Sequence, residues 1–122
     1  MPGMNSIPKR AGFLRARRDG EKAVAKGIVV QAVANGEAGS RLGITASKKI
    51  GNAVARNRAR RRLRALANDV LAPVARPGMD YVLIARFDTG TRPWNLLGED
   101  LTKTIGYLHR KLGTPNQPGS AT

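Results

Sequence analysis

Cysteine is absent from this 122-residue sequence, and histidine occurs only once, as His109. The lack of cysteine excludes disulfides and thiolate metal sites. One histidine leaves almost nothing from which to build a zinc hydrolase, a Ser/His/Asp site or a Cys/His site. His109 lies near the end of a predicted helix, so we expect it to be a solvated residue favoured by the helix dipole rather than a catalytic one.

Acidic residues and long apolar runs are also scarce. Eight Asp and Glu residues stand against 22 Lys and Arg, which gives a net charge of +14 and a pI of about 11.6. The carboxylates include no spaced pair typical of a two-metal nuclease, and no P-loop or Gly-x-Gly-x-x-Gly motif is present. No apolar run is long enough to span a membrane and no signal-peptide pattern is seen, so we expect a cytoplasmic protein without a membrane partner.

What the sequence does have is positive charge, for which nucleic acid is the default partner. The five aromatic residues are fewer than a single-strand binder built on stacked aromatics normally carries. Residues 47–71 hold the densest basic run, which no acidic residue interrupts before Asp69. Its basic residues up to position 64 are Lys48, Lys49, Arg56, Arg58, Arg60, Arg61, Arg62 and Arg64.

This run is predicted to form a helix that starts at an Asn52 N-cap and meets no Gly or Pro before Pro73. At about 100° per residue the apolar side chains share one stripe and the arginines spread over the remaining arc. The stripe consists of Ala59, Leu63, Leu66, Ala67 and Val70. Arginines in the first turns and at i,i+4 spacing repel one another, so we expect a polyanion to supply the missing charge. The alternatives are a merely solvated charge run, a localisation signal or disordered tail, and a membrane-surface helix.

The rest of the chain indicates a single RNA-binding domain over residues 1–122, with an ordered core at about 8–112. Hydrophobic periodicity predicts a basic helix at 8–18, one or two strands within 22–31, a strand at 41–47 and a central strand at 80–86. An amphipathic helix is predicted over 94–112. Residues 1–10 and 116–122 are expected to be loose. This element order indicates an α+β fold, a small α/β sandwich.

The run RLGITASKKIGNAVARNRARRRLR resembles the bacterial ribonuclease P protein component. The matching features are a strand with Gly43, then Lys48-Lys49, a short Gly/Asn loop, Arg56-Asn57-Arg58 and further basic residues. The resemblance implies the element order αβββαβα with an unusual left-handed crossover, a fold shared with one domain of a ribosomal protein. It also implies a ribonucleoprotein whose catalytic RNA, with bound Mg²⁺, removes the 5′ leader of precursor tRNA.

The resemblance also implies which residues meet RNA. Contacts to the catalytic RNA would come from Lys48, Lys49, Arg56, Asn57, Arg58, Arg60, Arg61 and Arg64. The leader would lie in a cleft between the first helix and the sheet, near Phe13, Arg17 and Gln31. Relatives often have an aromatic at the position of Arg17, and some have one at the position of Gln31, so we expect this cleft to rely more on charge and hydrogen bonds. Mg²⁺ would be bound mainly by the RNA, and no obligate protein partner or protein catalytic residue is expected.

Two other functional readings are compatible with the composition. A ribosomal protein or general RNA chaperone would share the size and charge, but would not be expected to share the Lys-Lys to Arg-Asn-Arg spacing. An autonomous nuclease would have to cleave without an RNA subunit, and the carboxylates disfavour it.

Overall fold

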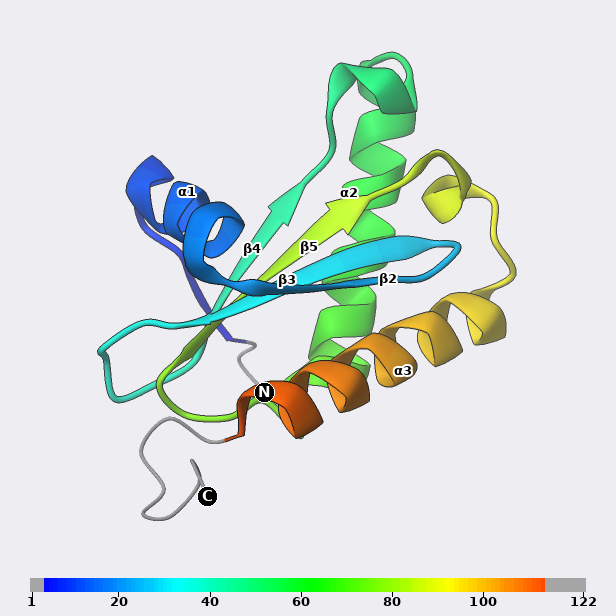
Figure 1. Cartoon of the computed structure of the whole chain (residues 1–122). Helices are drawn as coiled ribbons and strands as arrows, with labels where there is room; N and C mark the ends of the chain where they lie inside the picture. Colours follow the sequence, from blue (N-terminus) through cyan, green and yellow to red (C-terminus); the bar gives the residue numbers. More distant parts are fainter. Residues whose placement is uncertain (1–3, 114–122) are drawn as a thin grey trace.

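The computed structural model describes residues 4–113, which form a five-stranded sheet in the order β1-β4-β5-β3-β2. The strands are β1 (Asn5–Ser6), β2 (Glu21–Val24), β3 (Ile28–Ala34), β4 (Arg41–Thr45) and β5 (Met79–Ala85). The helices are α1 (Arg10–Asp19), α2 (Ala53–Leu66) and α3 (Trp94–Leu112), with the single turns η1 (Lys48–Ile50), η2 (Ala67–Leu71) and η3 (Phe87–Gly90). Helix α1 covers one face of the sheet, and α2 and α3 pack on the other (Figure 1).

The central strand β5 is buried on both faces because each face carries its own apolar cluster. Tyr81 and Leu83 point into the larger cluster with α2 and α3, whereas Val82 and Ile84 point into the smaller cluster beneath α1. This is the two-residue alternation of a strand. The position of β5 between β3 and β4 confirms the prediction of a central strand at 80–86.

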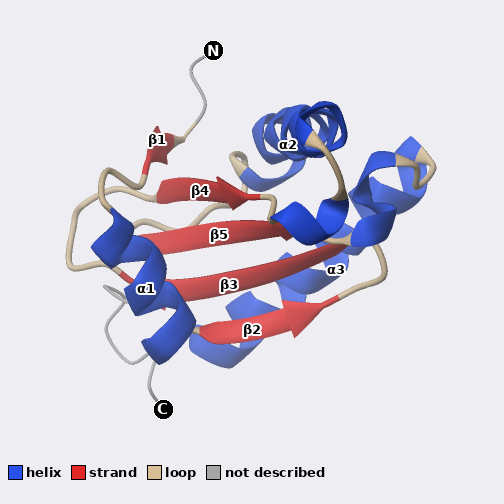
Figure 2. Cartoon of the chain, turned by 90° about the horizontal axis from the view of Figure 1, so that it is seen from above, coloured by secondary structure: helices blue, strands red, loops and turns tan. Residues whose placement is uncertain are grey.

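Strands β4 and β5 are parallel neighbours, and the chain passes between them through α2. Seen from the α1 side, this connection runs behind the sheet and is left-handed, the rare hand for such a unit (Figure 2). The order αβββαβα is thus confirmed, together with the α+β class. The predicted strand region at 22–31 is two antiparallel strands, β2 and β3, and β3 continues to Ala34.

The beginning of the described chain differs from the prediction. Residues 1–10 were expected to be loose, but Asn5–Ser6 forms the edge strand β1, which pairs in parallel with β4. Ile7 is buried against α1. The first helix begins at Arg10 after the N-cap Lys9, so Pro8 lies outside it. An isolated two-residue strand has no sequence signal of its own because its pairing depends on β4.

Helix α2 starts as predicted: the Asn52 side chain accepts the Ala55 N–H at 2.9 Å. Ala59, Leu63 and Leu66 are buried, which confirms the apolar stripe. The helical path continues beyond Leu66 as a π-helical turn to Leu71. Because the stripe packs on the sheet, the arginines are left on the outer arc, and the alternative of a disordered tail is excluded.

The expectation for His109 was wrong. Its side chain is buried, and its Nε2 lies 2.6 Å from the Tyr81 hydroxyl, which also accepts the N–H of Arg76. Burial, followed by repulsion from Arg76, lowers the pKa of His109 to about 4. His109 is therefore a neutral core residue, which the helix pattern could not indicate because the partner comes from β5. None of the helices within residues 4–113 is both long and apolar enough to cross a membrane.

Candidate nucleic-acid interface

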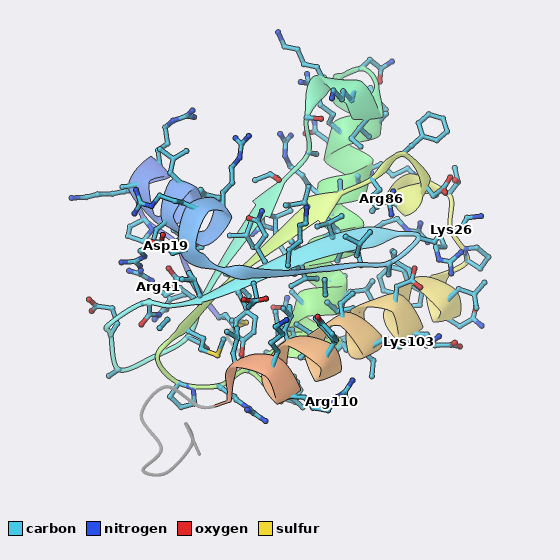
Figure 3. All side chains as sticks on the ribbon, in the orientation of Figure 1. Asp19, Lys26, Arg41, Arg86, Lys103 and Arg110 are labelled. Carbon is cyan, nitrogen blue, oxygen red and sulfur yellow. The ribbon has the colours of Figure 1, made fainter. Side chains whose placement is uncertain are left out.

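The outer arc of α2 carries positive charge without acidic partners. Among residues 4–113, no ion pair includes a residue of α2, although pairs occur at α1, β4 and α3. Arg61 and Arg64 are exposed, as are Lys48 and Lys49 in the turn before the helix. Basic side chains also occur outside α2, for example Arg86 before η3, and Lys103 and Arg110 in α3 (Figure 3). Helix α2 and η1 together are the most strongly cationic continuous segment of the described chain.

Two of the arginines also hold the structure together. Arg58 donates from Nε to the Gly90 carbonyl at 2.8 Å while its side chain remains exposed. Arg62 donates to the carbonyls of Thr89 and Arg92, and its guanidinium lies 5.4 Å from the centre of the Trp94 ring. Burial, followed by repulsion from Arg58, lowers the pKa of Arg62. Arg58 and Arg62 are thus one pair of like charges at i,i+4 spacing on α2.

Three further residues of the predicted set lie between Arg56 and Arg60 of α2. Asn57 accepts a hydrogen bond from Arg60 at 3.1 Å, and Arg60 also reaches the carbonyl of Ala46 at 3.4 Å. Arg56 is half-buried, and its buried Nε has no hydrogen-bond partner within residues 4–113. The structure thus brings the eight predicted RNA-contacting residues onto one continuous element pair, η1 and α2. It does not test whether they contact RNA.

The three predicted leader residues lie together in one cleft between α1 and the open part of the sheet. Arg17 and Phe13 belong to its α1 wall, and Gln31 belongs to its floor on β3. The remaining lining residues are Arg10, Leu14, Thr45, Val82 and Ile84. Sequence reasoning missed Arg10, although its spacing of seven residues from Arg17 places both on the same helix face. The cleft combines a cationic wall with a mixed polar and apolar floor.

Phe13 is half-buried, and its ring packs against Gly43 of β4. A Cβ atom at Gly43 would lie 2.4 Å from Cε1 of the Phe13 ring, so only glycine permits this contact. Phe13 also lines a second hollow that it shares with Arg64 and Asn68. The ring therefore packs in the fold and borders both the α1 cleft and the cationic side of α2.

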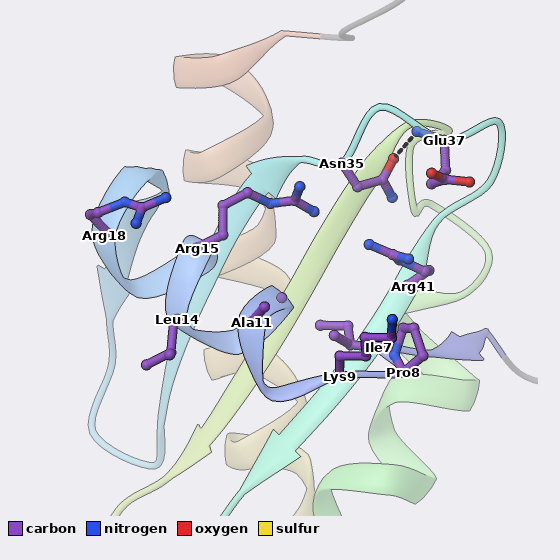
Figure 4. Close-up of a pocket in the computed structure, with 11 residues that line it drawn as sticks. Ile7, Pro8, Lys9, Ala11, Leu14, Arg15, Arg18, Asn35, Glu37 and Arg41 are labelled. Carbon is purple, nitrogen blue, oxygen red and sulfur yellow. Dashed lines mark hydrogen bonds between the residues drawn. The ribbon is translucent and has the colours of Figure 1, made fainter.

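A buried carboxylate fixes α1 above the sheet. Asp80 of β5 is fully buried and accepts hydrogen bonds from Arg41 at 2.8 and 2.9 Å, from Asn35 at 2.9 Å and from Arg15 of α1 at 3.4 Å. Burial tends to raise the pKa of Asp80, but the hydrogen bonds from Arg41 and Asn35 outweigh it and lower the pKa. Asn35 also accepts the Glu37 N–H, which orders the loop beside a hollow next to α1 (Figure 4). Through Arg15, this network links α1 to the central strand β5.

The described residues offer no evident metal centre of their own. Within residues 4–113, no three His, Cys, Asp or Glu side chains gather closely enough to hold an ion. Glu99 and Asp100, which are neighbours in α3, lie in different surroundings. Asp100 is buried, pairs with Arg92 and accepts the Gly27 N–H, whereas Glu99 is exposed.

Comparison with known proteins gives a consistent result. A sequence profile of the family described as Ribonuclease P matches residues 1–109. The ribonuclease P protein component of Ruegeria pomeroyi is 51% identical over 114 residues, covering 88% of each chain. That of Paramagnetospirillum magneticum is 44% identical over 115 residues, covering 88% of this chain and 86% of the relative.

Solved structures agree with these sequence relatives. The RNase P protein of Staphylococcus aureus has a TM-score of 0.70 at 28% identity, covering 84% of this chain and 93% of that one. The RNase P protein of Thermotoga maritima has a TM-score of 0.70 at 27% identity, covering 87% and 96%. With the basic α2, the α1 cleft and the fold already described, these matches show that the chain belongs to the ribonuclease P protein family.

Proposed function

We propose that this chain, as the protein subunit of ribonuclease P, binds the catalytic RNA through the outer arc of η1 and α2. In that complex it assists the endonucleolytic removal of the 5′ leader from precursor tRNA. We assign RNA binding to this surface because the cationic arc of α2 is unbroken. None of the described ion pairs includes a residue of α2. A helix crowded in this way gains most when phosphates lie between its guanidinium groups.

The chemistry of this binding is electrostatic. Each phosphate that an arginine or lysine neutralises releases condensed counterions, so affinity should fall steeply with salt. Guanidinium forks also pair with phosphate oxygens through two hydrogen bonds. Arg61, Arg64, Lys48 and Lys49 are exposed and are the first candidates for such contacts. Arg58 can contribute a second face of its guanidinium while its Nε stays on Gly90.

The α1 cleft is proposed to hold the single-stranded leader. Arg10 and Arg17 would face its phosphates, Gln31 would offer hydrogen bonds, and Phe13 provides the one aromatic ring. Because Phe13 also borders the hollow at Arg64, a strand in the cleft would lie next to the RNA bound on α2. This adjacency would let one small protein hold both the catalytic RNA and the substrate.

Mg²⁺ is proposed to be bound mainly by the RNA, where it would supply the charge needed for phosphodiester hydrolysis. The chain's part is then to hold RNA and substrate so that their phosphates approach one another. We also propose that the protein acts in the cytoplasm, where bacterial precursor tRNA is made.

Reconstitution tests this function. Precursor tRNA is incubated at low Mg²⁺ with the bacterial catalytic RNA alone, with the protein alone, and with both. We expect cleavage at the mature 5′ end to be much faster with both than with RNA alone, and absent with protein alone. Cleavage by the protein alone would favour an autonomous nuclease, and RNA binding without stimulation would leave only a general RNA-binding module.

A further inference from the structure

The turn η3 presents an unusually exposed aromatic ring beside α2. Phe87 is 80% exposed, the highest value among the exposed large hydrophobic residues of the described chain. Trp94, at the start of α3, is 45% exposed and lies against the Arg62 guanidinium. A phenylalanine ring left in water does not contribute the free energy that its burial would supply. A single exposed apolar residue is ordinary, so the surroundings of this one decide its meaning.

The backbone that carries Phe87 is held firmly. The Thr89 hydroxyl donates to the Gly27 carbonyl at 2.6 Å and accepts the Arg86 N–H at 2.8 Å. From the other side, Arg58 and Arg62 donate to the carbonyls of Gly90 and Thr89. The turn is thus tied both to the β2–β3 hairpin and to α2. The backbone that carries the ring is therefore already ordered, which lowers the entropy lost when a ligand binds there.

The charge around the turn suits an anionic ligand. Arg86 precedes Phe87 and donates to the Ala25 carbonyl, and Lys26 lies at the same end of the molecule (Figure 3). Arg58 approaches from α2 and remains exposed. Asp88 is the only acidic residue of the turn itself. An aromatic face flanked by arginines is the combination that proteins use to bind unpaired nucleotides, with the base on the ring and the phosphates on the cations.

We propose that η3 is a base-stacking site, at which an unpaired RNA nucleotide stacks on Phe87 while its backbone phosphates lie near Arg58 and Arg86. The site is continuous with α2 through Arg58, which donates to Gly90, so it extends the proposed RNA-binding surface from α2 to this turn. This inference rests on the proposed function. RNA is favoured over a protein partner because the flanking groups are mostly cationic and the chain carries a net charge of +14.

The proposal also accounts for where base stacking occurs in this chain. The α1 cleft holds one aromatic, Phe13, and that ring is half-buried against Gly43. Arg17 and Gln31 complete the predicted leader site without rings. Phe87 in η3 is exposed, so more of its surface than of the Phe13 ring is accessible to a base, and stacking is expected to be stronger there than in the cleft.

The test compares Phe87→Ala, Phe87→Leu and Phe87→Trp in binding to the bacterial catalytic RNA over a range of KCl concentrations. We expect the Ala and Leu variants to bind about tenfold more weakly and the Trp variant to bind at least as well as wild type. The slope of log affinity against log salt should not change, because no phosphate contact is removed. Val74→Ala, at a residue 51% exposed and distant in sequence from η3, is the matched control and should bind as wild type.

Three results would overturn the stacking site. They are wild-type binding by Phe87→Ala, full affinity in Phe87→Leu, and a loss of affinity that comes with a changed salt slope. Normal RNA binding by Phe87→Ala together with loss of a co-purifying protein would assign the turn to a protein partner instead.

An Arg61→Ala, Arg64→Ala double variant in the same assay separates this proposal from the proposed function. If that variant loses affinity while the Phe87 variants do not, only the stacking site fails; if no variant has an effect, both fail.

Discussion

Arg61 and Arg62 are neighbours in α2, yet the structure gives them opposite roles. Arg61 is exposed and makes no hydrogen bond or ion pair within residues 4–113, whereas Arg62 donates to two carbonyls and covers Trp94. Replacing each by alanine removes the same charge from the same helix. Any difference between the two variants must therefore come from what their side chains contact.

The magnitudes follow from these contacts. A hydrogen bond from a charged donor contributes about 1.5–3 kcal/mol, and a cation–π contact about 0.5–1 kcal/mol. Arg62 is partly solvated, so we expect Arg62→Ala to lower the free energy of unfolding by about 2–3 kcal/mol. In a domain of this size, that corresponds to a Tm lower by roughly 10 °C. Arg61→Ala should leave the Tm within about 1–2 °C, since exposed substitutions are usually within 0.5 kcal/mol of neutral.

RNA binding should show the reverse order. Arg61→Ala should reduce the salt slope of binding to the catalytic RNA by about one, the loss of one phosphate contact. Arg62→Ala should leave that slope nearly unchanged at a temperature where both variants are folded. Thermal unfolding by circular dichroism and filter binding over a KCl series measure the two effects. Equal Tm losses, or a slope that falls only for Arg62→Ala, would refute the division of roles.

Three further predictions concern the core and the cleft. The unfolded chain protonates His109 below about pH 6.5 and the folded chain only below about 4, so its stabilising contribution is complete above pH 6.5 and is lost as the pH falls. Urea unfolding should therefore show about 2 kcal/mol less stability at pH 5 than at pH 7. His109→Gln should flatten this dependence of stability on pH. An unchanged dependence in that variant would contradict the buried neutral ring. Gly43→Ala should destabilise the fold by about 1–3 kcal/mol because the new Cβ collides with Phe13. A Phe13→Ala, Gly43→Ala double variant should lose less stability than the sum of the losses in the two single variants. Strict additivity would contradict the contact. Arg17→Ala should raise the KM of precursor tRNA with a long leader more than it weakens binding of mature tRNA. The control is Arg18→Ala, because Arg18 lies on another side of α1 and pairs with Asp19. Equal effects on both RNAs would remove Arg17 from the leader cleft.

The sequence predicted α2 well because its information is local. The Asn52 cap and the apolar stripe through Leu63 depend on residues within a few turns of one another. The same holds for the central strand β5, whose unbroken apolar run is typical of burial on both faces. The charge of α2 could likewise be read directly, since charge does not depend on packing.

What the sequence could not predict depends on contacts between distant segments. Arg62 looks like its neighbours in the basic run, and only the approach of η3 gives it two carbonyl acceptors. His109 looked solvated because its partner Tyr81 lies 28 residues earlier. The short strand β1 exists only because β4 offers it an edge. For the leader residues, the resemblance supplied the grouping that the structure then brought together in one cleft.

The most direct test of the account is cross-linking from single cysteines, which the cysteine-free chain allows without background. A photoreactive group is placed on Arg61→Cys at the arc of α2, on Leu14→Cys at the α1 cleft, and on Thr102→Cys at an exposed position of α3. In the assembled complex, we expect position 61 to cross-link to the catalytic RNA, position 14 to the leader of precursor tRNA, and position 102 to neither. Cross-links of equal yield from all three positions, or none from position 61, would contradict the claim that α2 and the cleft bind these two RNAs.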